Sequence, residues 1–348
     1  MKKITLDTIL QHERQAIDRE KRRRRLRGEN RSTQEASNND FYAQISNRNT
    51  VTFDERCEFT NSNINATLEP ILSLRSKVES GEKVVLDFSK TVYCSAIFVV
   101  YLFSEIELLM NQYGQNTIDL NLYTLPDKLK RLFKGIGLLQ LIKTRVSDNT
   151  SRRFLPVTRG INDQQLDDII SFVIDQARFK TDLSDQQRAR VELLTSSAIS
   201  EAMLNVQYHA YPTSEIDRYW WIMAAIIDGD LYIALCDRGV GIPSTLPYSS
   251  WWEQIMGALP INDDAQMIAA AMKYTRSSVI GKRGRGKGTR DIQKLVLEHK
   301  KGLLTIVSGK GLYRLNGAPY EEDRREEHFP LLYDISGTAI NWRIPLED

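Results

Sequence analysis

A carboxylate, an amide and an imidazole recur every four residues in the stretch EAMLNVQYH, at Glu201, Asn205 and His209. On a helix that turns about 100° per residue, side chains four apart drift by only about 40° per step. The three groups therefore form one polar column. An apolar stripe runs beside it, made of Val191, Leu194, Ala198, Ala202 and Val206. We expect this helix to bury one side and to turn the three polar groups toward a shared cavity.

A second carboxylate stands at the end of a strand-like run. Asp237 closes the apolar segment LYIALC and is followed by Gly239 and Gly241, with one residue between them. Glycines let the backbone turn tightly, and a loop at a strand end is a common place for binding residues. Such a pattern also occurs in simple turns. It indicates a binding site here because it occurs together with the polar helix and with a second glycine cluster.

A third motif is the glycine cluster GKRGRGKGTRDIQ, in which Gly284, Gly286 and Gly288 alternate with Arg285 and Lys287. Glycines let backbone N–H groups approach an anion, and a helix is expected to begin at the end of the cluster. The start of a helix adds partial positive charge, and the two cations complete a cradle suited to phosphate.

Two other known patterns partly match this cluster. Residues 281–287 fit the pattern GxxxxGK of a P-loop, but Gly288 stands where that loop carries Ser or Thr, and the preceding RSSVI is not a buried strand. The stretch RGRGKG also looks like an arginine-glycine segment that binds nucleic acid, although those segments usually lie in long repeats. A phosphate cradle at a helix start fits better than either.

In this order, the motifs resemble the N, G1 and G2 boxes of the GHKL superfamily, which includes gyrase, histidine kinases and anti-sigma-factor serine kinases. Gly337-Thr338 before the last strand resembles the Gly-Thr pair that closes the nucleotide pocket in kinase members. The resemblance covers residues 160–348. It implies an α/β sandwich, a mixed sheet covered by helices, with ATP bound under a mobile lid formed by residues 243–282.

The resemblance also implies roles for the residues that hold the nucleotide. Asp237 would accept a hydrogen bond from the adenine amino group, with Gly239 and Gly241 shaping the loop beside it. Thr338 would close the same pocket. The phosphates would lie against the backbone of residues 284–288.

The remaining implied roles concern the phosphates and the chemistry. Asn205 would ligate Mg²⁺, an ion that keeps several waters and takes few protein oxygens. Arg285 and Lys287 would neutralise phosphate charge, and His209 would reach a phosphate when protonated. Glu201 would polarise a water or a substrate hydroxyl, as phosphoryl transfer requires.

The first half carries a different resemblance. Residues 83–142, with the strand VVLDFS, a long helix from Ser95 and the closing GIGLLQLI, resemble a STAS domain, the fold of anti-sigma-factor antagonists. Members that are phosphorylated have an Asp-Ser pair at the start of this helix. Here the pair is Cys94-Ser95, so phosphorylation of Ser95 is in doubt.

The chain is expected to form two α/β domains, because a single core seldom exceeds about 250–300 residues and this chain has 348. The predicted parts are a basic helical arm and polar linker at 1–49, a STAS-like domain at 50–145 and a GHKL domain at 160–348. A polar stretch at 143–162, containing Pro156 and Gly160, separates the two domains.

Hydrophobic periodicity and turn residues predict the elements of both halves. Helices are expected at 63–79, 95–113, 126–134, 164–179, 184–210, 263–274 and from the glycine cluster to 299. Strands are expected at 50–60, 83–88, 117–123, 219–227, 231–236, 303–308, 312–315 and 338–344. Asp228-Gly229 between two apolar runs is a strong hairpin signal.

The N-terminal arm holds the one local charge excess in a chain of net charge +2, since residues 1–30 carry ten Lys and Arg against five Asp and Glu. The basic run at 21–27 could bind nucleic acid or an acidic partner, or simply be solvated. The three cysteines suggest buried thiols rather than disulfides or a zinc site. No stretch reads as a membrane span or signal, so a cytoplasmic protein is expected.

The sequence thus predicts a Mg-ATP-binding regulatory protein with slow ATPase or serine/threonine protein kinase activity, acting as a nucleotide-controlled switch toward a protein partner. One alternative is an ATP sensor without catalysis. Another is a nucleic-acid-associated ATPase that uses the basic arm. Assembly with a second copy stays open, whereas a membrane partner is not expected.

Overall fold

The computed structural model describes residues 49–142, 154–160, 166–180, 184–211, 218–248, 261–274, 288–299, 301–318, 320 and 323–345. The chain divides into the units Met1–Thr50 and Val51–Asp348, and the elements described below lie in the second unit, apart from Thr50 at the start of β1. The basic run at 21–27 lies outside the described residues. So do Gly284, Arg285, Gly286 and Lys287.

The first half is built around a three-stranded sheet of order β1-β3-β5, in which β3 and β5 are parallel. A separate two-residue parallel pair joins β2 to β4. The strand expected at 50–60 is therefore two short strands. The elements are β1 (Thr50–Thr52), β2 (Arg56–Cys57), α3 (Ile64–Glu79), β3 (Val84–Asp87), β4 (Tyr93–Cys94), α4 (Ala96–Tyr113), β5 (Ile118–Leu120), α5 (Asp127–Gly135) and α6 (Leu138–Ile142).

Helix α4 is the central element of this half. Ser95 caps it, because the Oγ atom accepts a hydrogen bond from the N–H of Phe98 at 3.4 Å. Thirteen of its eighteen residues are buried, around the whole circumference of its first three turns. A helix that is apolar on all sides must be covered on all sides. Within the described part of the chain, no helix is long and apolar enough to cross a membrane.

The second half is built on a five-stranded sheet of order β6-β7-β8-β10-β9. All four strand pairs are antiparallel, which corrects the mixed sheet expected from the sequence. Local patterns predict strands but not the direction in which distant strands pair. The strands are β6 (Phe154–Gly160), β7 (Trp220–Ile227), β8 (Asp230–Asp237), β9 (Leu303–Asn316) and β10 (Arg325–Pro345).

Three features of this sheet depart from the expected elements. Strand β6 lies inside the stretch 143–162 that was expected to be a polar connection, and it pairs with β7 as an edge strand. The runs at 303–308 and 312–315 form one strand, β9, that continues through Gly309 and Gly311. Strand β10 begins well before Thr338, with register shifts between Pro330 and Thr338. By contrast, the β7–β8 hairpin is confirmed, with positive φ at Asp228 and Gly229.

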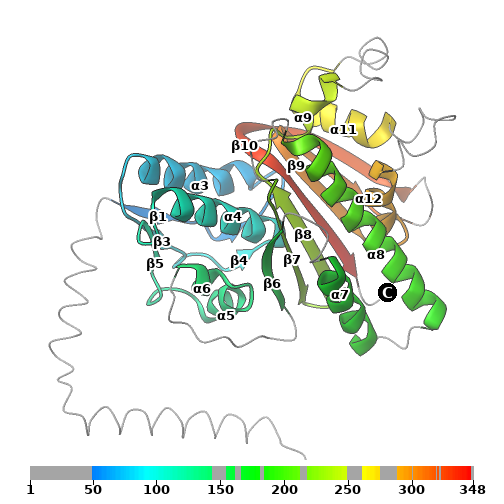
Figure 1. Cartoon of the computed structure of the whole chain (residues 1–348), viewed down its shortest axis with the longest axis horizontal. Helices are drawn as coiled ribbons and strands as arrows, with labels where there is room; N and C mark the ends of the chain where they lie inside the picture. The colour runs from blue at the N-terminus through cyan, green and yellow to red at the C-terminus, as the bar shows by residue number, and fades with distance from the viewer. Residues whose placement is uncertain are drawn as a thin grey trace, which may run out of the picture. The chain divides into compact units, whose positions relative to one another are not determined.

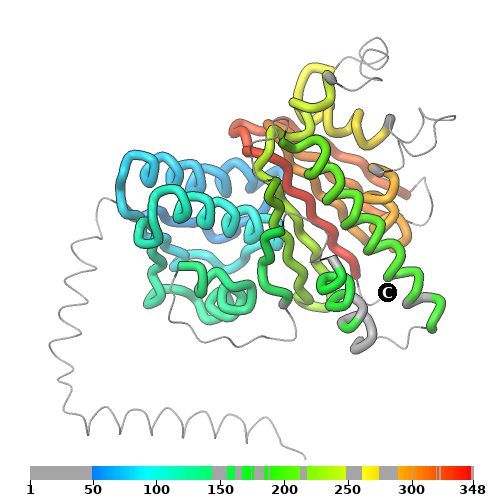
Figure 2. The backbone as a smooth tube through the Cα atoms, viewed as in Figure 1, coloured from blue at the N-terminus to red at the C-terminus, as the bar shows by residue number. Residues whose placement is uncertain are grey.

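One face of the sheet is covered by the helices of the second half, as Figures 1 and 2 show. These are α7 (Leu166–Lys180), α8 (Asp185–Asn205), α11 (Asp264–Tyr274) and α12 (Gly288–Leu297). Helix α8 continues into a π-helix, η2 (Val206–Ala210), where one uninterrupted α-helix was expected. Short turns α9 (Ile242–Thr245) and η3 (Leu246–Tyr248) follow β8.

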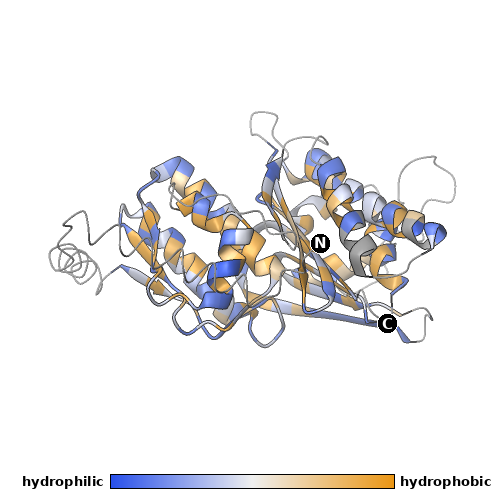
Figure 3. Ribbon diagram, turned by 90° about the horizontal axis from the view of Figure 1, so that it is seen from below, coloured by the Kyte–Doolittle hydropathy of each residue, from blue (hydrophilic) through white to orange (hydrophobic). Residues whose placement is uncertain are grey.

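The other face of the sheet is covered by the first half of the chain. Along β7, alternate residues enter two separate core clusters: Trp220, Ile222, Ala224 and Ile226 on the α8 side, and Trp221, Met223 and Ala225 on the α4 side. This alternation follows from the two-residue period of a strand. Figure 3 shows helices on both sides of the sheet. An antiparallel sheet commonly leaves one face solvated, and this one does not.

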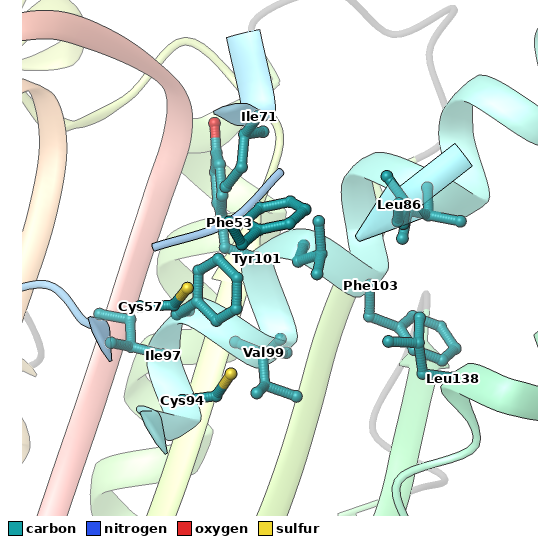
Figure 4. Close-up of a cluster of buried hydrophobic side chains, with 14 of the residues drawn as sticks. Phe53, Cys57, Ile71, Leu86, Cys94, Ile97, Val99, Tyr101, Phe103 and Leu138 are labelled. Atoms are coloured by element: carbon teal, nitrogen blue, oxygen red, sulfur yellow. The ribbon is translucent and has the colours of Figure 1, made fainter. Parts of the chain in front are cut away.

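The cluster on the α4 side joins both halves in one core. It runs from Val51 and Phe53 through α4 to Cys236, Val307 and Ala339. Figure 4 shows part of it, with side chains from α3, β3, α4 and α6 packed together. Cys57, Cys94 and Cys236 are free and buried, as the sequence suggested.

Candidate functional site

Asp237 is the buried carboxylate of the site. It is the last residue of β8, only 4% exposed, and its Oδ1 atom accepts a hydrogen bond from the N–H of Gly239 at 2.8 Å. Burial raises the pKa of Asp237 to about 7, and the N–H groups of Gly239 and Thr338 oppose that rise. A carboxylate held this way is strongly disposed to accept a further donor, because its charge is poorly solvated.

The glycine loop after Asp237 is held against the end of η2. The N–H of Val240 donates to the carbonyl of Ala210 at 2.8 Å. Gly239 lies so close that a Cβ atom there would be 2.1 Å from the same carbonyl oxygen. The Tyr211 hydroxyl donates to the Tyr219 carbonyl at 2.8 Å and lies 3.1 Å from the N–H of Arg238. The helix that carries the polar column and the Asp237 loop therefore meet at these residues.

A second loop, at Gly337-Thr338, packs on the first. A Cβ atom at Gly337, where φ is +88°, would lie 2.1 Å from the carbonyl oxygen of Asp237. The buried Ser308 Oγ atom accepts from the N–H of Ile242 at 2.8 Å and lies 3.0 Å from both the Gly337 carbonyl and Thr338 Oγ1. Ser308 thus ties the loop at 237–242 to the Gly-Thr pair.

Gly241 completes this junction. It has φ +83°, and a Cβ atom there would lie 2.8 Å from Ser308 Oγ. Only glycine adopts that backbone conformation without strain and leaves room for the hydroxyl. The alternating glycines in DRGVG are therefore explained by close approach at Gly239 and by both space and conformation at Gly241.

The polar column lies on two types of helix. Glu201 and Asn205 are half-buried near the end of α8, whereas His209 is exposed on η2. Burial, and then the nearby Asp291 carboxylate, raise the pKa of Glu201. Partial desolvation lowers the pKa of His209, so the neutral imidazole is favoured. Because η2 has a wider turn than an α-helix, His209 departs from the straight column expected from the sequence.

The position of Asp291 indicates where Glu201 lies relative to the glycine cluster. It lies in the first turn of α12, a helix that begins at Gly288, the last glycine of that cluster. Its influence on the pKa of Glu201 means that the start of α12 faces the end of α8, consistent with the packing of these two helices. Of the expected lid at 243–282, residues 243–248 and 261–274 are described.

The described residues contain no group of three or more His, Cys, Asp or Glu that could hold a metal ion. The donor that fits Mg²⁺ by its chemistry is the amide oxygen of Asn205, whose side chain makes no capping hydrogen bond to η2. A single amide suits an ion whose other ligands are water and phosphate oxygens. This donor set is compatible with a nucleotide-bound ion rather than with a protein cage.

The structure therefore brings Asp237, Gly239, Gly241 and Thr338 into one junction and places Glu201 opposite α12. Sequence reasoning missed Ser308, Tyr211 and Asp291. Ser308 lies in an apolar strand and Tyr211 directly after η2, neither at a recognisable spacing, and only the tertiary fold brings them to the loop. Asp291 stands in TRDIQ directly after the glycine cluster, a visible but nonspecific signal for the first turn of a helix.

No protein-family model matches this chain, and no curated protein is similar to it in sequence. The fold itself is a mixed α/β structure with several sheets. The residues that bear on function are therefore those of the two loops around Asp237 and of the helix that meets them.

Proposed function

We propose that this chain is a Mg-ATP-binding regulatory protein of the GHKL type, with a STAS-like domain at 50–145 and an ATP-binding domain at 160–348. In this proposal ATP is turned over by a slow ATPase or serine/threonine protein kinase activity, and the nucleotide controls binding of a protein partner. The observation that carries it is the buried carboxylate of Asp237, set where two glycine loops converge beside the end of a polar helix.

Asp237 would select adenine. An exocyclic amino group donates a hydrogen bond, and a buried carboxylate with one backbone partner on Oδ1 has capacity for it. A base without that donor would leave the carboxylate unpaired, at a cost of about 1–3 kcal/mol. The Ser308 hydroxyl and Thr338 would fix the loops on either side of the base.

The phosphates would lie toward the start of α12. A helix N-terminus favours negative charge, and Arg285 and Lys287 stand three residues and one residue before Gly288, where the helix begins. Mg²⁺ would be held by the amide oxygen of Asn205 together with phosphate oxygens, and it would neutralise charge on the phosphates when bound. His209 would add a contact to a phosphate in its protonated form.

Glu201 would orient the nucleophile. Its carboxylate accepts a hydrogen bond from a water or hydroxyl and takes the proton as the nucleophile attacks phosphorus. The raised pKa of Glu201 makes it a better base than a solvated carboxylate. The neighbouring Asp291 contributes to that rise, so both helices shape the basicity of this group.

The proposal is tested by incubating the purified protein with Mg²⁺ and ATP labelled at the γ-phosphate and following the label into free phosphate and into protein. Glu201→Gln keeps the shape of the side chain but removes the base, and we expect turnover to fall by about 10²–10⁴-fold with ATP still bound. Asp237→Asn is expected to weaken ATP binding itself.

Glu298→Gln is the matched control, because Glu298 directly follows α12 and contacts Arg190 of α8 at 2.5 Å, but on the exposed side of the two helices. It should leave turnover unchanged. Label in neither pool, with ATP still bound by wild type and lost in Asp237→Asn, would replace the enzyme with a nucleotide sensor. Absence of ATP binding to wild-type protein would overturn the proposal as a whole.

A further inference from the structure

The residue that follows Asp237 points to the opposite face of the sheet. Side chains alternate along β8, so Leu235 and Asp237 face α8, whereas Cys236 and Arg238 face α4. Cys236 lies against the backbone of α4, with Sγ 3.6 Å from the Val100 carbonyl oxygen. The same loop therefore carries the candidate adenine carboxylate on one side and a buried arginine on the other.

Arg238 is only 7% exposed and is held by α4 of the first half. Its Nη2 atom donates to Glu105 Oε2, and its guanidinium lies 4.3 Å from the centre of the Tyr101 ring. Within the described residues, its Nε and Nη1 atoms have no acceptor. Arg238 therefore depends on Glu105 for compensation of its charge.

Glu105 holds a second arginine that reaches the other loop of the site. Arg75 of α3 donates from Nε and Nη2 to the two Glu105 carboxylate oxygens, at 2.7 and 2.8 Å. Its Nη1 atom lies 3.4 Å from Ser336 Oγ, one residue before Gly337. One carboxylate of the first half, 2% exposed, is thus connected to both loops that form the junction around Asp237.

The energy of this cluster depends strongly on the positions of its three side chains, because their charges do not cancel. Two arginines share one buried carboxylate, so the group carries a net positive charge in a poorly solvated place. Removing the carboxylate would leave two charges without compensation, which is far more costly than losing a surface ion pair. A shift of the Asp237 loop moves Arg238 with it, and hence changes a strong contact with α4.

We infer that Glu105, Arg75 and Arg238 form a positioning cluster through which the first half of the chain sets the geometry of the ATP site, so that ATP binding and docking of α3 and α4 reinforce each other. This inference rests on the proposed function. Coupling between two sites is reciprocal: if the docked first half favours ATP, then ATP stabilises the docking by the same factor. None of the three residues touches the nucleotide in this proposal.

A neighbouring residue on the same helix supplies a matched control. Glu107 also links α4 to the sheet, accepting from Trp221 Nε1 at 2.7 Å and lying 3.5 Å from Arg159 Nη1. Those partners lie on β7 and β6, and neither belongs to the loops at 237–242 or 336–338. Glu107→Gln therefore weakens the docking surface without loosening the site loops.

The test measures ATP dissociation constants for full-length wild type, Glu105→Gln, Arg75→Gln and Glu107→Gln. We expect about tenfold weaker ATP binding in Glu105→Gln and Arg75→Gln, and less than a twofold change in Glu107→Gln. Arg75 is partly exposed, so we expect Arg75→Gln to cost less stability than the loss of buried Glu105. Equal affinities in all four proteins, or an equal loss in Glu107→Gln, would overturn the coupling.

Hydrogen exchange of residues 96–113 gives a readout that simple destabilisation does not mimic. Mg-ATP should slow exchange of this helix in wild type and Glu107→Gln but not in Glu105→Gln. An ATP effect on exchange that survives in Glu105→Gln would also overturn the coupling. If the wild type binds ATP and the Glu105 and Glu107 variants do not differ, only this inference is refuted. If the wild type binds no ATP, the proposed function is refuted too.

Discussion

Asp237 predicts a pH dependence at the scale of a single residue. Its pKa is raised from 3.8 to about 7 in the folded protein. Between these two pH values the folded protein keeps the proton on Asp237, whereas the unfolded chain has released it. Its contribution to stability is therefore fully present below about pH 4 and is lost as the pH rises toward 7. Adenine binding has the opposite requirement, because the acceptor is the ionised carboxylate.

We expect the ATP dissociation constant to increase about tenfold from pH 8 to pH 6, as the carboxylate of the free protein is protonated. Calorimetric titration across this range measures it. The residual binding of Asp237→Asn serves as the control, since it reports any titration of the phosphates themselves. Parallel pH profiles for wild type and variant would mean that Asp237 is not the group that titrates with binding.

Some residues of the site could be predicted from their spacing in the sequence, and others could not. Glu201, Asn205, Asp237 and the glycines after it stand at recognisable intervals, because local geometry demands them. Arg238 lies inside the same motif, but its role depends on Glu105, which is 133 residues away in the sequence. Distant pairs of this kind leave no trace in a single sequence, so no pattern could have predicted the cluster.

At the scale of elements, the contact between the Asp237 loop and the end of η2 decides whether the loop is formed. Gly239→Ala places a Cβ atom 2.1 Å from the Ala210 carbonyl oxygen, so backbone atoms must move and the Val240–Ala210 hydrogen bond is disrupted. We expect a loss of about 1–3 kcal/mol in the free energy of unfolding and at least tenfold weaker ATP binding. Denaturant unfolding and ATP titration measure the two effects.

Gly229→Ala is the control for that prediction. Gly229 has φ +92° in the β7–β8 hairpin, and a Cβ atom there meets nothing within 4 Å. Its substitution costs about 1–2 kcal/mol of backbone strain without touching the site. ATP affinity that falls equally in both variants would show that general destabilisation, and not the contact with Ala210, controls the loop.

Most helices and strands were predicted from periodicity, because amphipathic and apolar runs are local properties. The departures have identifiable causes. The π-helix at Val206–Ala210 forms where the chain meets the Asp237 loop, a tertiary contact that the 3.6-residue pattern does not contain. Strand β6, FLPVTRG, was missed because it lies inside a polar stretch and contains Pro156, a residue that strands tolerate mainly at the edge of a sheet.

At the scale of the whole unit from Val51 to Asp348, the sheet is covered on both faces. The apolar run WWIMAAII is consistent with a strand buried on both sides, yet it does not say what covers the second face. The two domains predicted at 50–145 and 160–348 stay a prediction as separate structural modules. Their shared core implies a thermodynamic property that can be measured.

We expect the two halves to unfold as one cooperative unit, because α4 and the α4 side of β7 and β8 would each expose apolar side chains without the other half.

Val100→Ala removes buried methyl groups from α4 where its backbone contacts Cys236, and should cost about 2 kcal/mol. Native-state hydrogen exchange should show this loss equally in residues 96–113 and 220–237. Val92→Ala, at a position that is 53% exposed, should change neither. Loss of protection confined to residues 96–113 would mean that the first half unfolds while the sheet stays folded. Any coupling to the ATP site would then control whether the first half stays docked on the folded sheet.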